Sequence, residues 1–280
     1  MPRDVDALTS STLKHLREHW WSAEFTDFLR ETLQPRAGNR ILDVGCGVGT
    51  AEVQLGQLGI SQVRLFGADL IAPRVVEAVA AARAHNIRAR FTVADACRLP
   101  FASGAFDSTF CVAVLQHLRD VAAAVGEFAR VTRPGGRVLV VEPDNAARYW
   151  YSTSPLGRRA FDVATRFFNA IDGRGYGTDP AVGPKIPEIL ARHGLEPAAI
   201  RVFPVCQARM GSPDAAVWDG RRATVRGAID RLQDPSLRQL GEEYLRVVDE
   251  YAAEAQAAGK TFVEIQNTML FATVGRKPAA

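Results

Sequence analysis

The sequence predicts an α/β protein built on a doubly wound, mostly parallel β-sheet. Between residues 41 and 141, short apolar segments typical of buried strands alternate with segments of helical periodicity. A glycine-rich turn follows the first of these strands, and an acidic residue follows the second and the third. Strands that alternate with helices form βαβ units, whose right-handed crossovers place helices on both faces of a parallel sheet.

The first half of the chain supplies a helical segment and five strands. Residues 10–33 are predicted as one or two helices, because apolar side chains recur there every three or four positions. The predicted strands are residues 41–44, 63–68, 88–93, 106–115 and 137–141. The predicted helices between them are residues 51–58, 73–85 and 120–132, of which the first ends at Gly59.

The alternation loosens after residue 142, where we expect two insertions. Residues 144–187 hold an aromatic cluster, a predicted helix over 155–169 and a glycine-rich stretch, which is typical of a lid. A helix is expected over 186–193 and a sixth strand over 200–206. A strongly helical, charged stretch at 215–258 precedes a seventh strand at 263–274, and we expect the last two strands to pair as an antiparallel edge.

The composition is that of an ordinary globular protein. Of the 280 residues, 47% are hydrophobic and 23% are charged, and the net charge is +3. No apolar run approaches the roughly 18–20 residues that span a bilayer, and the first residues lack the pattern of a signal peptide, so we expect a cytoplasmic protein. The four scattered cysteines predict neither a disulfide framework nor a zinc site, and no basic run indicates nucleic-acid binding.

The glycine-rich turn lies in the sequence RILDVGCGVGT, residues 40–50, and reads GxGxG. A dinucleotide-binding loop reads GxGxxG, and its third glycine is replaced here by Thr50. Asp69 ends the second strand about 20 residues after the loop, where a carboxylate accepts ribose hydroxyls. Asp95 ends the third strand at the same edge of the sheet, within reach of an adenine amine.

The segments DVGCGVG, GADL, VADA and RPGG, in this order and spacing, resemble the class I S-adenosylmethionine-dependent methyltransferases. The similarity is to the small-molecule branch that includes the ubiquinone, menaquinone and sterol enzymes, and it covers about residues 35–145. It implies a Rossmann-like, seven-stranded sheet whose last strand is antiparallel. It also implies a single methyltransferase domain over residues 1–280, with a helical cover (1–36), a cofactor-binding core (37–143), a lid insertion (144–187) and a C-terminal part (188–280) that contains a helical insertion (213–259).

The resemblance implies S-adenosylmethionine as cofactor and no metal. The glycines would pass beneath its methionine part, Asp69 would hold the ribose, and Asp95 with the Ala96 backbone would hold the adenine. The predicted cofactor-binding residues are Asp43, Gly45, Cys46, Gly47, Gly49, Asp69, Leu70, Asp95, Ala96, Ala113, Gln116 and His117.

Residues for catalysis and substrate binding are less specified by the sequence. His117, Glu142 and Asp144 follow the fourth and fifth strands and are candidates for a general base, although methyl transfer often needs only alignment, and an acid there also serves as a solvated or lid-bonding group. The predicted substrate pocket consists of Trp20, Trp21, Tyr149, Trp150, Tyr151, Tyr176 and Gln266, although core packing or a solvated edge also explains them.

The sequence therefore predicts methyl transfer to an O, N or C atom of a small, partly apolar molecule, in specialised metabolism. Three alternatives stay open: a protein or RNA methyltransferase, an S-adenosylmethionine-dependent cyclisation, elimination or rearrangement, and a binding-only partner subunit. A small-molecule substrate is expected as the partner, without nucleic acid or membrane, and a homodimer is possible.

Overall fold

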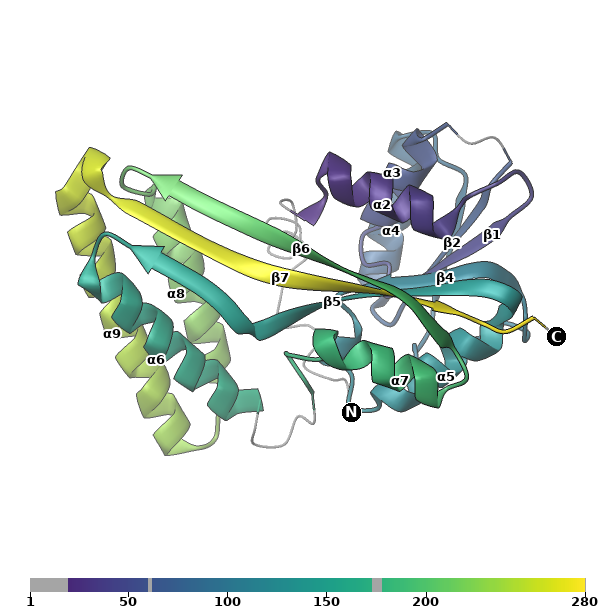
Figure 1. The fold of residues 1–280 in the computed structure, drawn as a ribbon. Coiled ribbons are helices and arrows are strands. Elements are labelled where there is room, and N and C mark those ends of the chain that lie inside the picture. The colour runs from purple at the N-terminus through teal and green to yellow at the C-terminus, as the bar shows by residue number, and fades with distance from the viewer. Residues whose placement is uncertain (1–19, 60–61, 173–177, 280) are drawn as a thin grey trace. The chain divides into compact units, whose positions relative to one another are not determined.

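The computed structural model describes residues 20–59, 62–172 and 178–279, and the chain packs as two compact units (Figure 1). Among the described residues, we call 20–59, 62–146, 179–203 and 269–279 the larger unit, and 147–172, 178 and 204–268 the smaller unit. Three strands, β5, β6 and β7, have residues in both units.

The helices and strands follow the predicted alternation through the first half of the chain. In the larger unit they are α2 (Ala23–Leu33), β1 (Arg40–Val44), α3 (Thr50–Gln57), β2 (Arg64–Asp69), α4 (Ala72–Ala84), β3 (Ala89–Val93), β4 (Phe106–Val112), η3 (Leu115–His117), α5 (Val121–Val131), η4 (Gly183–Lys185) and α7 (Ile186–Arg192). The shared strands are β5 (Thr132–Ser152), β6 (Glu196–Met210) and β7 (Val263–Arg276). The smaller unit adds α6 (Pro155–Asp172), α8 (Ala215–Asp230), α9 (Pro235–Ala258) and η5 (Gly259–Thr261).

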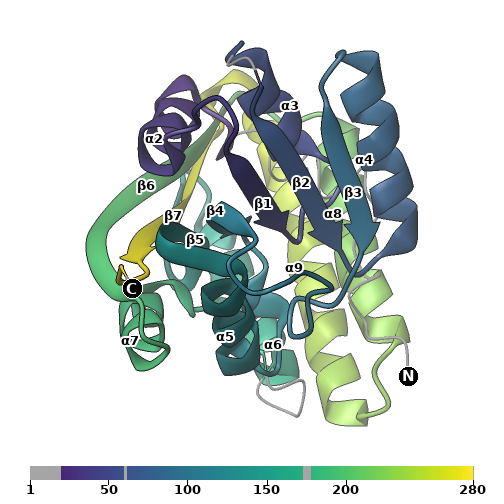
Figure 2. The same ribbon diagram turned by 90° about the vertical axis from the view of Figure 1, so that its right-hand side faces the viewer.

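The strands form a seven-stranded sheet in the order β3-β2-β1-β4-β5-β7-β6. The pairs β1–β2, β1–β4, β2–β3 and β4–β5 are parallel, and Figure 2 shows β3, β2, β1 and β4 side by side. Parallel pairing brings the carboxyl ends of β1, β2 and β3 to one edge. Ligands of parallel α/β sheets bind at that edge.

The last strand runs against its neighbours. Thr153 N–H donates to the Val263 carbonyl and Tyr149 N–H to the Asn267 side chain, so residues of β5 and β7 pair in opposite directions. Gly211 N–H donates to the Phe262 carbonyl, which places β6 antiparallel to β7 as well. The predicted mostly parallel sheet with an antiparallel last strand is confirmed.

The larger unit has a core on the α5 side of its sheet. Leu42 and Val44 of β1 point to this face, where they join Val125 and Phe128 of α5 in one buried cluster. Asp43, between them, points to the opposite face because side chains alternate along a strand. One face of β1 is therefore apolar, whereas the other carries a buried acid.

The smaller unit packs α6, α8 and α9 together beside its parts of β5, β6 and β7 (Figure 1). Its core includes Trp218, Tyr251 and Phe262. The helical stretch predicted at 215–258 is two helices, because Pro235 begins α9 and the Asp234 carboxylate caps it by accepting the Ser236 and Leu237 N–H groups.

Two further differences from the predicted elements concern lengths. The fifth strand continues to Ser152 instead of ending at residue 141, so the aromatic cluster at 149–151 lies on a strand. The sixth strand is likewise longer, from Glu196 to Met210. Of the helix predicted over 10–33, the described part is α2, and residues 1–19 lie outside the described residues.

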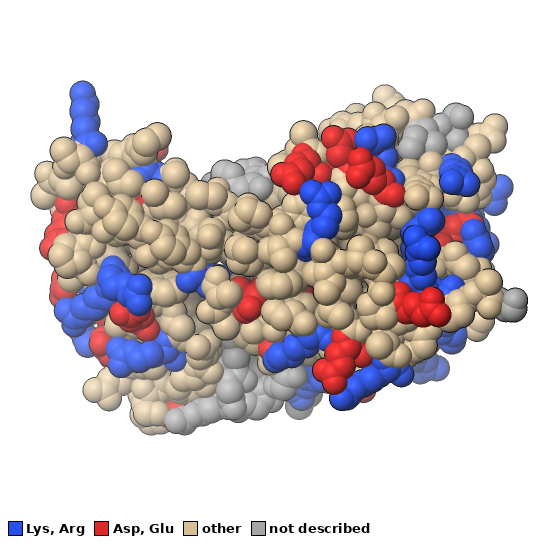
Figure 3. Space-filling view, in the orientation of Figure 1, with Lys and Arg blue, Asp and Glu red and all other residues tan. Residues whose placement is uncertain are grey.

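Positive and negative side chains alternate on the face drawn in Figure 3. Arg133 pairs with Asp107 at 2.7 Å, and Arg192 pairs with Glu188 at 2.6 Å. In the described part of the chain, no helix is long and apolar enough to cross a membrane.

Two helical glycines of the smaller unit test its packing. In Gly241→Ala the new methyl group would lie 2.5 Å from Ile229 Cγ1 and 2.8 Å from Phe167 Cε2. We expect this overpacking to cost about 1–3 kcal/mol, more than the helix propensity gain of alanine. Gly227→Ala meets no described atom within 4 Å and should stabilise by about 0.5–1 kcal/mol. Urea unfolding measures both, and equal effects would contradict this packing.

Candidate cofactor site

The glycine loop between β1 and α3 lies at the carboxyl edge of the sheet. Its three glycines have positive φ, +76° at Gly45, +55° at Gly47 and +80° at Gly49. The Gly45 and Cys46 N–H groups donate to the Ala68 carbonyl of β2, at 2.6 and 3.1 Å, and Gly49 N–H donates to the Cys46 carbonyl at 3.0 Å. The loop therefore turns back on itself and is attached to the adjacent strand.

The three glycines differ in what surrounds them. A Cβ at Gly45 would lie 2.3 Å from Val114 Cγ2, and one at Gly49 would lie 3.0 Å from Ala78 Cβ, so neighbouring elements require glycine at both positions. A Cβ at Gly47 would have no described atom within 4 Å. Gly47 thus presents its backbone to open space, as a ligand-binding loop requires.

Asp69, at the end of β2, holds the loop through Gly47. Its Oδ2 accepts the Gly47 N–H at 2.8 Å and its Oδ1 accepts the Ile71 N–H at 2.9 Å. The side chain is 7% exposed, whereas its neighbour Leu70 is 43% exposed. A carboxylate accepts about four hydrogen bonds, so capacity for further donors is left on Asp69.

Asp95 lies beside Asp69 at the same edge. Ala94 N–H donates to the Asp69 carbonyl at 2.9 Å, and the Asp95 carboxylate accepts the Cys97 N–H at 2.9 Å. Ala96, between Asp95 and Cys97 in the sequence, is buried. The structure thus brings together the predicted glycine loop, Asp69 and Asp95.

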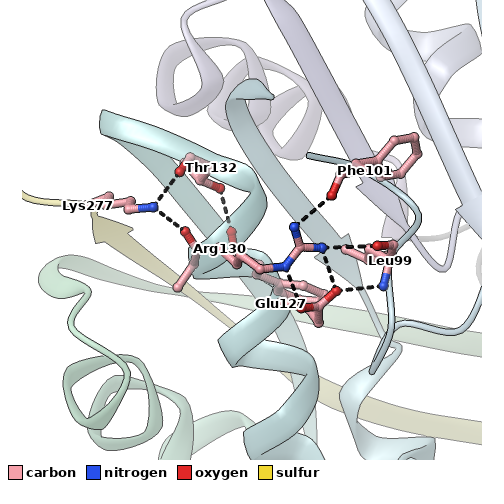
Figure 4. Close-up of polar contacts among 8 residues, drawn as sticks. Leu99, Phe101, Glu127, Arg130, Thr132 and Lys277 are labelled. Atoms are coloured by element: carbon pink, nitrogen blue, oxygen red, sulfur yellow. Dashed lines mark hydrogen bonds and ion pairs between the residues drawn. The ribbon is translucent and has the colours of Figure 1, made fainter. Parts of the chain in front are cut away.

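Helix α5 fixes the loop that follows Asp95 (Figure 4). Arg130 donates to the carbonyls of Phe101 at 2.7 Å and Leu99 at 3.0 Å, while the Glu127 carboxylate accepts the Leu99 N–H at 2.7 Å. Hydrogen bonding from Arg130 lowers the pKa of Glu127, so this carboxyl stays charged. Lys277 donates to the carbonyls of Ala129 and Thr132 at the end of the same helix.

Glu142 holds the segment that follows β4. The carboxylate is fully buried, and its Oε1 accepts the N–H groups of Val114 and Leu115, each at 2.7 Å. Its Oε2 accepts the Gln116 N–H at 3.3 Å. Ala113, just before this segment, has a φ of +55°, which is uncommon for a residue with a side chain. These contacts favour a positioning role for Glu142, and its predicted role as a base stays untested.

Asn145 is a polar group that the sequence analysis missed. Its Nδ2 donates to Gln116 Oε1 at 3.1 Å and to the Pro180 carbonyl at 3.0 Å. It thereby joins η3 to the segment before η4. The sequence feature that could have indicated Asn145 is its position three residues after Glu142, at the same edge of the sheet.

The other two residues predicted as general bases are His117 and Asp144. His117, at the end of η3, is exposed. Asp144 is half-buried and accepts the Ala146 N–H at 2.9 Å. Both remain predictions, with more access to solvent than Glu142.

Two acidic side chains are buried near the glycine loop. Asp43 of β1 is 4% exposed and Glu52 of α3 is 1% exposed. Burial raises the pKa of Glu52 well above its usual range, and the nearby Asp43 raises it further. Burial likewise raises the pKa of the Cys46 thiol, with Glu52 as the next cause. Glu52 was not predicted, because its place on α3 reads as an ordinary surface position.

The described residues of the predicted substrate pocket are divided between the two units. Trp21 packs edge-on against Phe25 at 5.5 Å, and Trp20 beside it is half-buried, both in the larger unit. Trp150 and Gln266 lie in the smaller unit, as do Tyr149 and Tyr151, which are 55% and 45% exposed. Tyr176 lies outside the described residues. Among the described side chains, no three potential metal ligands cluster.

Comparison with known proteins identifies the domain. Residues 42–140 match the family model described as "Methyltransferase domain". A demethylmenaquinone methyltransferase of Thermus thermophilus is 36% identical over 107 residues, which are 38% of this chain and 48% of that protein. The chain spans less than half the length of this and two other curated relatives, from 40% to 48%.

Solved structures of low sequence identity share the fold. The cyclase SpnF has a TM-score of 0.55 at 21% identity, covering 100% of this chain and 86% of that one. Phosphoethanolamine N-methyltransferase 2 of Haemonchus contortus, in complex with S-adenosylmethionine, has a TM-score of 0.57 at 18% identity, covering 98% of this chain and 59% of that one.

The fold, the glycine loop and the family match define a class I S-adenosylmethionine-dependent methyltransferase domain. Residues 42–140 carry this domain, as the sequence motifs predict, and S-adenosylmethionine is the cofactor of such domains. The open space at Gly47, next to Asp69, fits a cofactor that approaches the loop backbone.

Gly47→Ala separates cofactor binding from backbone strain. The positive φ of +55° should cost about 1–2 kcal/mol of stability, and the added methyl group would project into the open space beside Asp69. We expect the affinity for S-adenosylmethionine to fall at least tenfold in calorimetry. Gly194→Ala, with a φ of +71° and equally open surroundings, is the control and should lose stability alone. Equal affinities in the two variants would contradict this placement.

Glu142→Gln tests whether Glu142 positions the backbone. The amide would replace an acceptor oxygen by a donor among three N–H groups, so we expect a loss of about 1–3 kcal/mol in thermal or urea unfolding. Glu188→Gln on the surface of α7 should change stability by less than about 0.5 kcal/mol. A Glu142 variant of normal stability that lacked only turnover would instead favour the base.

Proposed function

We propose that this chain transfers a methyl group from S-adenosylmethionine to an O, N or C atom of a small, partly apolar molecule. The observation that carries the proposal is the glycine loop held by Asp69, with the Gly47 backbone open to a ligand. The similarity to a curated methyltransferase extends over only 107 residues. It therefore supports the chemistry of the domain and does not identify the substrate.

The cofactor-binding residues follow from the loop and the strand ends. The backbone of Gly45 to Gly49 would lie beneath the methionine part, Asp69 would accept the ribose hydroxyls, and Asp95 with the Ala96 backbone would meet the adenine. The bound cofactor supplies an electrophilic methyl group on its sulfonium. Gln116, which Asn145 orients, would lie along the reacting end of the site together with Ala113 and His117.

The protein contributes mainly alignment to such a reaction. Methyl transfer is a displacement in which the acceptor atom attacks the methyl carbon in line with the leaving sulfur, so positioning supplies much of the rate. His117 and Asp144 are the proposed proton acceptors, since each is open to solvent to some extent. We propose Glu142 instead as the residue that positions Gln116.

The alternative functions are separated by the products formed. The fold that the chain shares with the cyclase SpnF fits a non-methylating reaction, although a likeness at 21% identity concerns the fold alone. Mass spectrometry after incubation with S-adenosylmethionine and candidate acceptors distinguishes a product one methylene heavier from a rearranged product of unchanged mass. A binding-only subunit would give neither.

Asp69→Asn tests the cofactor assignment. The variant keeps the size of the side chain and removes the charge and one acceptor oxygen, so S-adenosylmethionine binding should weaken at least tenfold, about 1.4 kcal/mol. Asp162→Asn, on the exposed face of α6, is the control and should bind normally. Unchanged affinity in Asp69→Asn would overturn the proposed site.

A further inference from the structure

The strands of the smaller unit turn a polar face toward its helices. On β5, Trp150 packs against Phe161 of α6 with ring centroids 5.5 Å apart, and Ser152 lies 2.8 Å from the Tyr251 hydroxyl of α9. On the neighbouring strands the same face carries Glu264 with Arg209, and then Gln266 with Gln207 at 2.9 Å. A sheet face covered by helices is ordinarily apolar, so these side chains need another explanation.

Positive charge exceeds negative charge in this cluster. Glu264 is fully buried, and its Oε1 accepts hydrogen bonds from Arg209 at 2.9 Å and from Arg221 at 2.5 Å. Its Oε2 accepts the Tyr251 hydroxyl at 2.9 Å. Two guanidiniums therefore share one carboxylate. Within the described residues each of them uses one of its five N–H donors on the protein.

Aromatic rings fix the position of Arg221. Its guanidinium lies 4.7 Å from the ring centroid of Trp218 and 5.5 Å from that of Trp150. The Trp150 indole N–H is buried and has no hydrogen-bond partner among the described residues. Buried donors are nearly always paired, so an unpaired indole beside an underused guanidinium indicates an acceptor that a ligand brings.

Tyr244 of α9 packs against the apolar cluster that includes Trp218 and Tyr251. Burial raises the pKa of this phenol, while the charge of Arg221 lowers it and that of Glu264 raises it. Tyr244 adds a neutral donor to the cluster. The local excess of positive charge favours an anion over a neutral ligand.

We propose that the smaller unit binds the carboxylate of a small organic acid through Arg209, Arg221 and the Trp150 indole. A carboxylate is planar and accepts two parallel hydrogen bonds from the N–H groups of a guanidinium. Arg209 and Arg221 together carry one more positive charge than Glu264 neutralises, and a single carboxylate supplies the matching negative charge. The surrounding rings pack against an apolar body. This inference goes beyond the proposed function, because ligand binding by the smaller unit does not depend on methyl transfer.

Calorimetry with benzoate, benzamide and phenyl phosphate tests the proposal without the methyl transfer reaction. Benzoate should bind the wild-type chain at least tenfold more tightly than benzamide, which has the same shape without the charge. Arg209→Gln should weaken benzoate binding at least tenfold, and Arg221→Lys should do so while keeping the charge, because the planar fork is lost. Arg222→Gln is the matched control, since Arg222 adjoins Arg221 but pairs with Asp249 and Asp219.

The proposal would be overturned if benzoate did not bind the wild type, or if it bound Arg209→Gln as tightly as the wild type. It would also be overturned if phenyl phosphate bound the wild type more tightly than benzoate, which would indicate a phosphate ester as the ligand. Circular dichroism of each variant excludes unfolding, and Arg209, the more exposed of the two, keeps the test decisive if Arg221→Lys fails to fold.

S-adenosylmethionine binding is measured on the same samples to separate the two proposals. Loss of benzoate binding with intact cofactor binding overturns only the carboxylate site. Absence of cofactor binding with intact benzoate binding overturns the proposed function.

Discussion

The hydrogen bond from Gly47 N–H to the Asp69 carboxylate connects the loop that follows β1 to the carboxyl end of β2. The proposed cofactor site depends on this connection. The parallel register pairs Val44 with Ala68, which brings the end of β1 beside the end of β2. The Ala68 carbonyl then accepts the first two loop N–H groups, and Asp69 accepts the Gly47 N–H, so consecutive residues of β2 act as a template for the glycine loop. A shift of this register by one residue would turn Asp69 to the other face and leave the loop without its acceptor.

Carboxylates that bind backbone N–H groups recur around the site. Asp69 binds the glycine loop, Asp95 its own turn, and Glu142 the segment after β4, each at the edge where the strands end. These carboxylates fix the backbone. The groups left open are the Gly47 backbone and the Leu70 side chain, and we propose that these meet a ligand. The smaller unit is organised differently, around a charged cluster of side chains joined by Glu264.

The sequence predicted the larger unit well because its signals are local. Strand and helix periods, the glycine turn and the acids at the ends of β2 and β3 each lie within a few residues of the element they mark. Glu142 required more, since its partners lie 26 to 28 residues earlier in the chain and its acidic character alone is equally typical of a base. The extension of β5 to Ser152 depends on pairing with β7, more than 100 residues later, which no local pattern reveals. Glu52 was missed for the same reason, because only the fold buries it.

The cysteines differ in ways that matter for chemical labelling. Cys46 in the glycine loop and Cys111 in β4 are buried, and burial raises the pKa of both thiols, so little of the reactive thiolate is present. Cys206, on β6 in the smaller unit, is exposed. Cys97 is half-buried, with its Sγ 3.5 Å from the Asp120 carbonyl, so a maleimide dye would attach preferentially at the more exposed Cys206 in the folded protein. The native chain thus carries its own attachment point for an optical probe on the unit that holds the charged cluster.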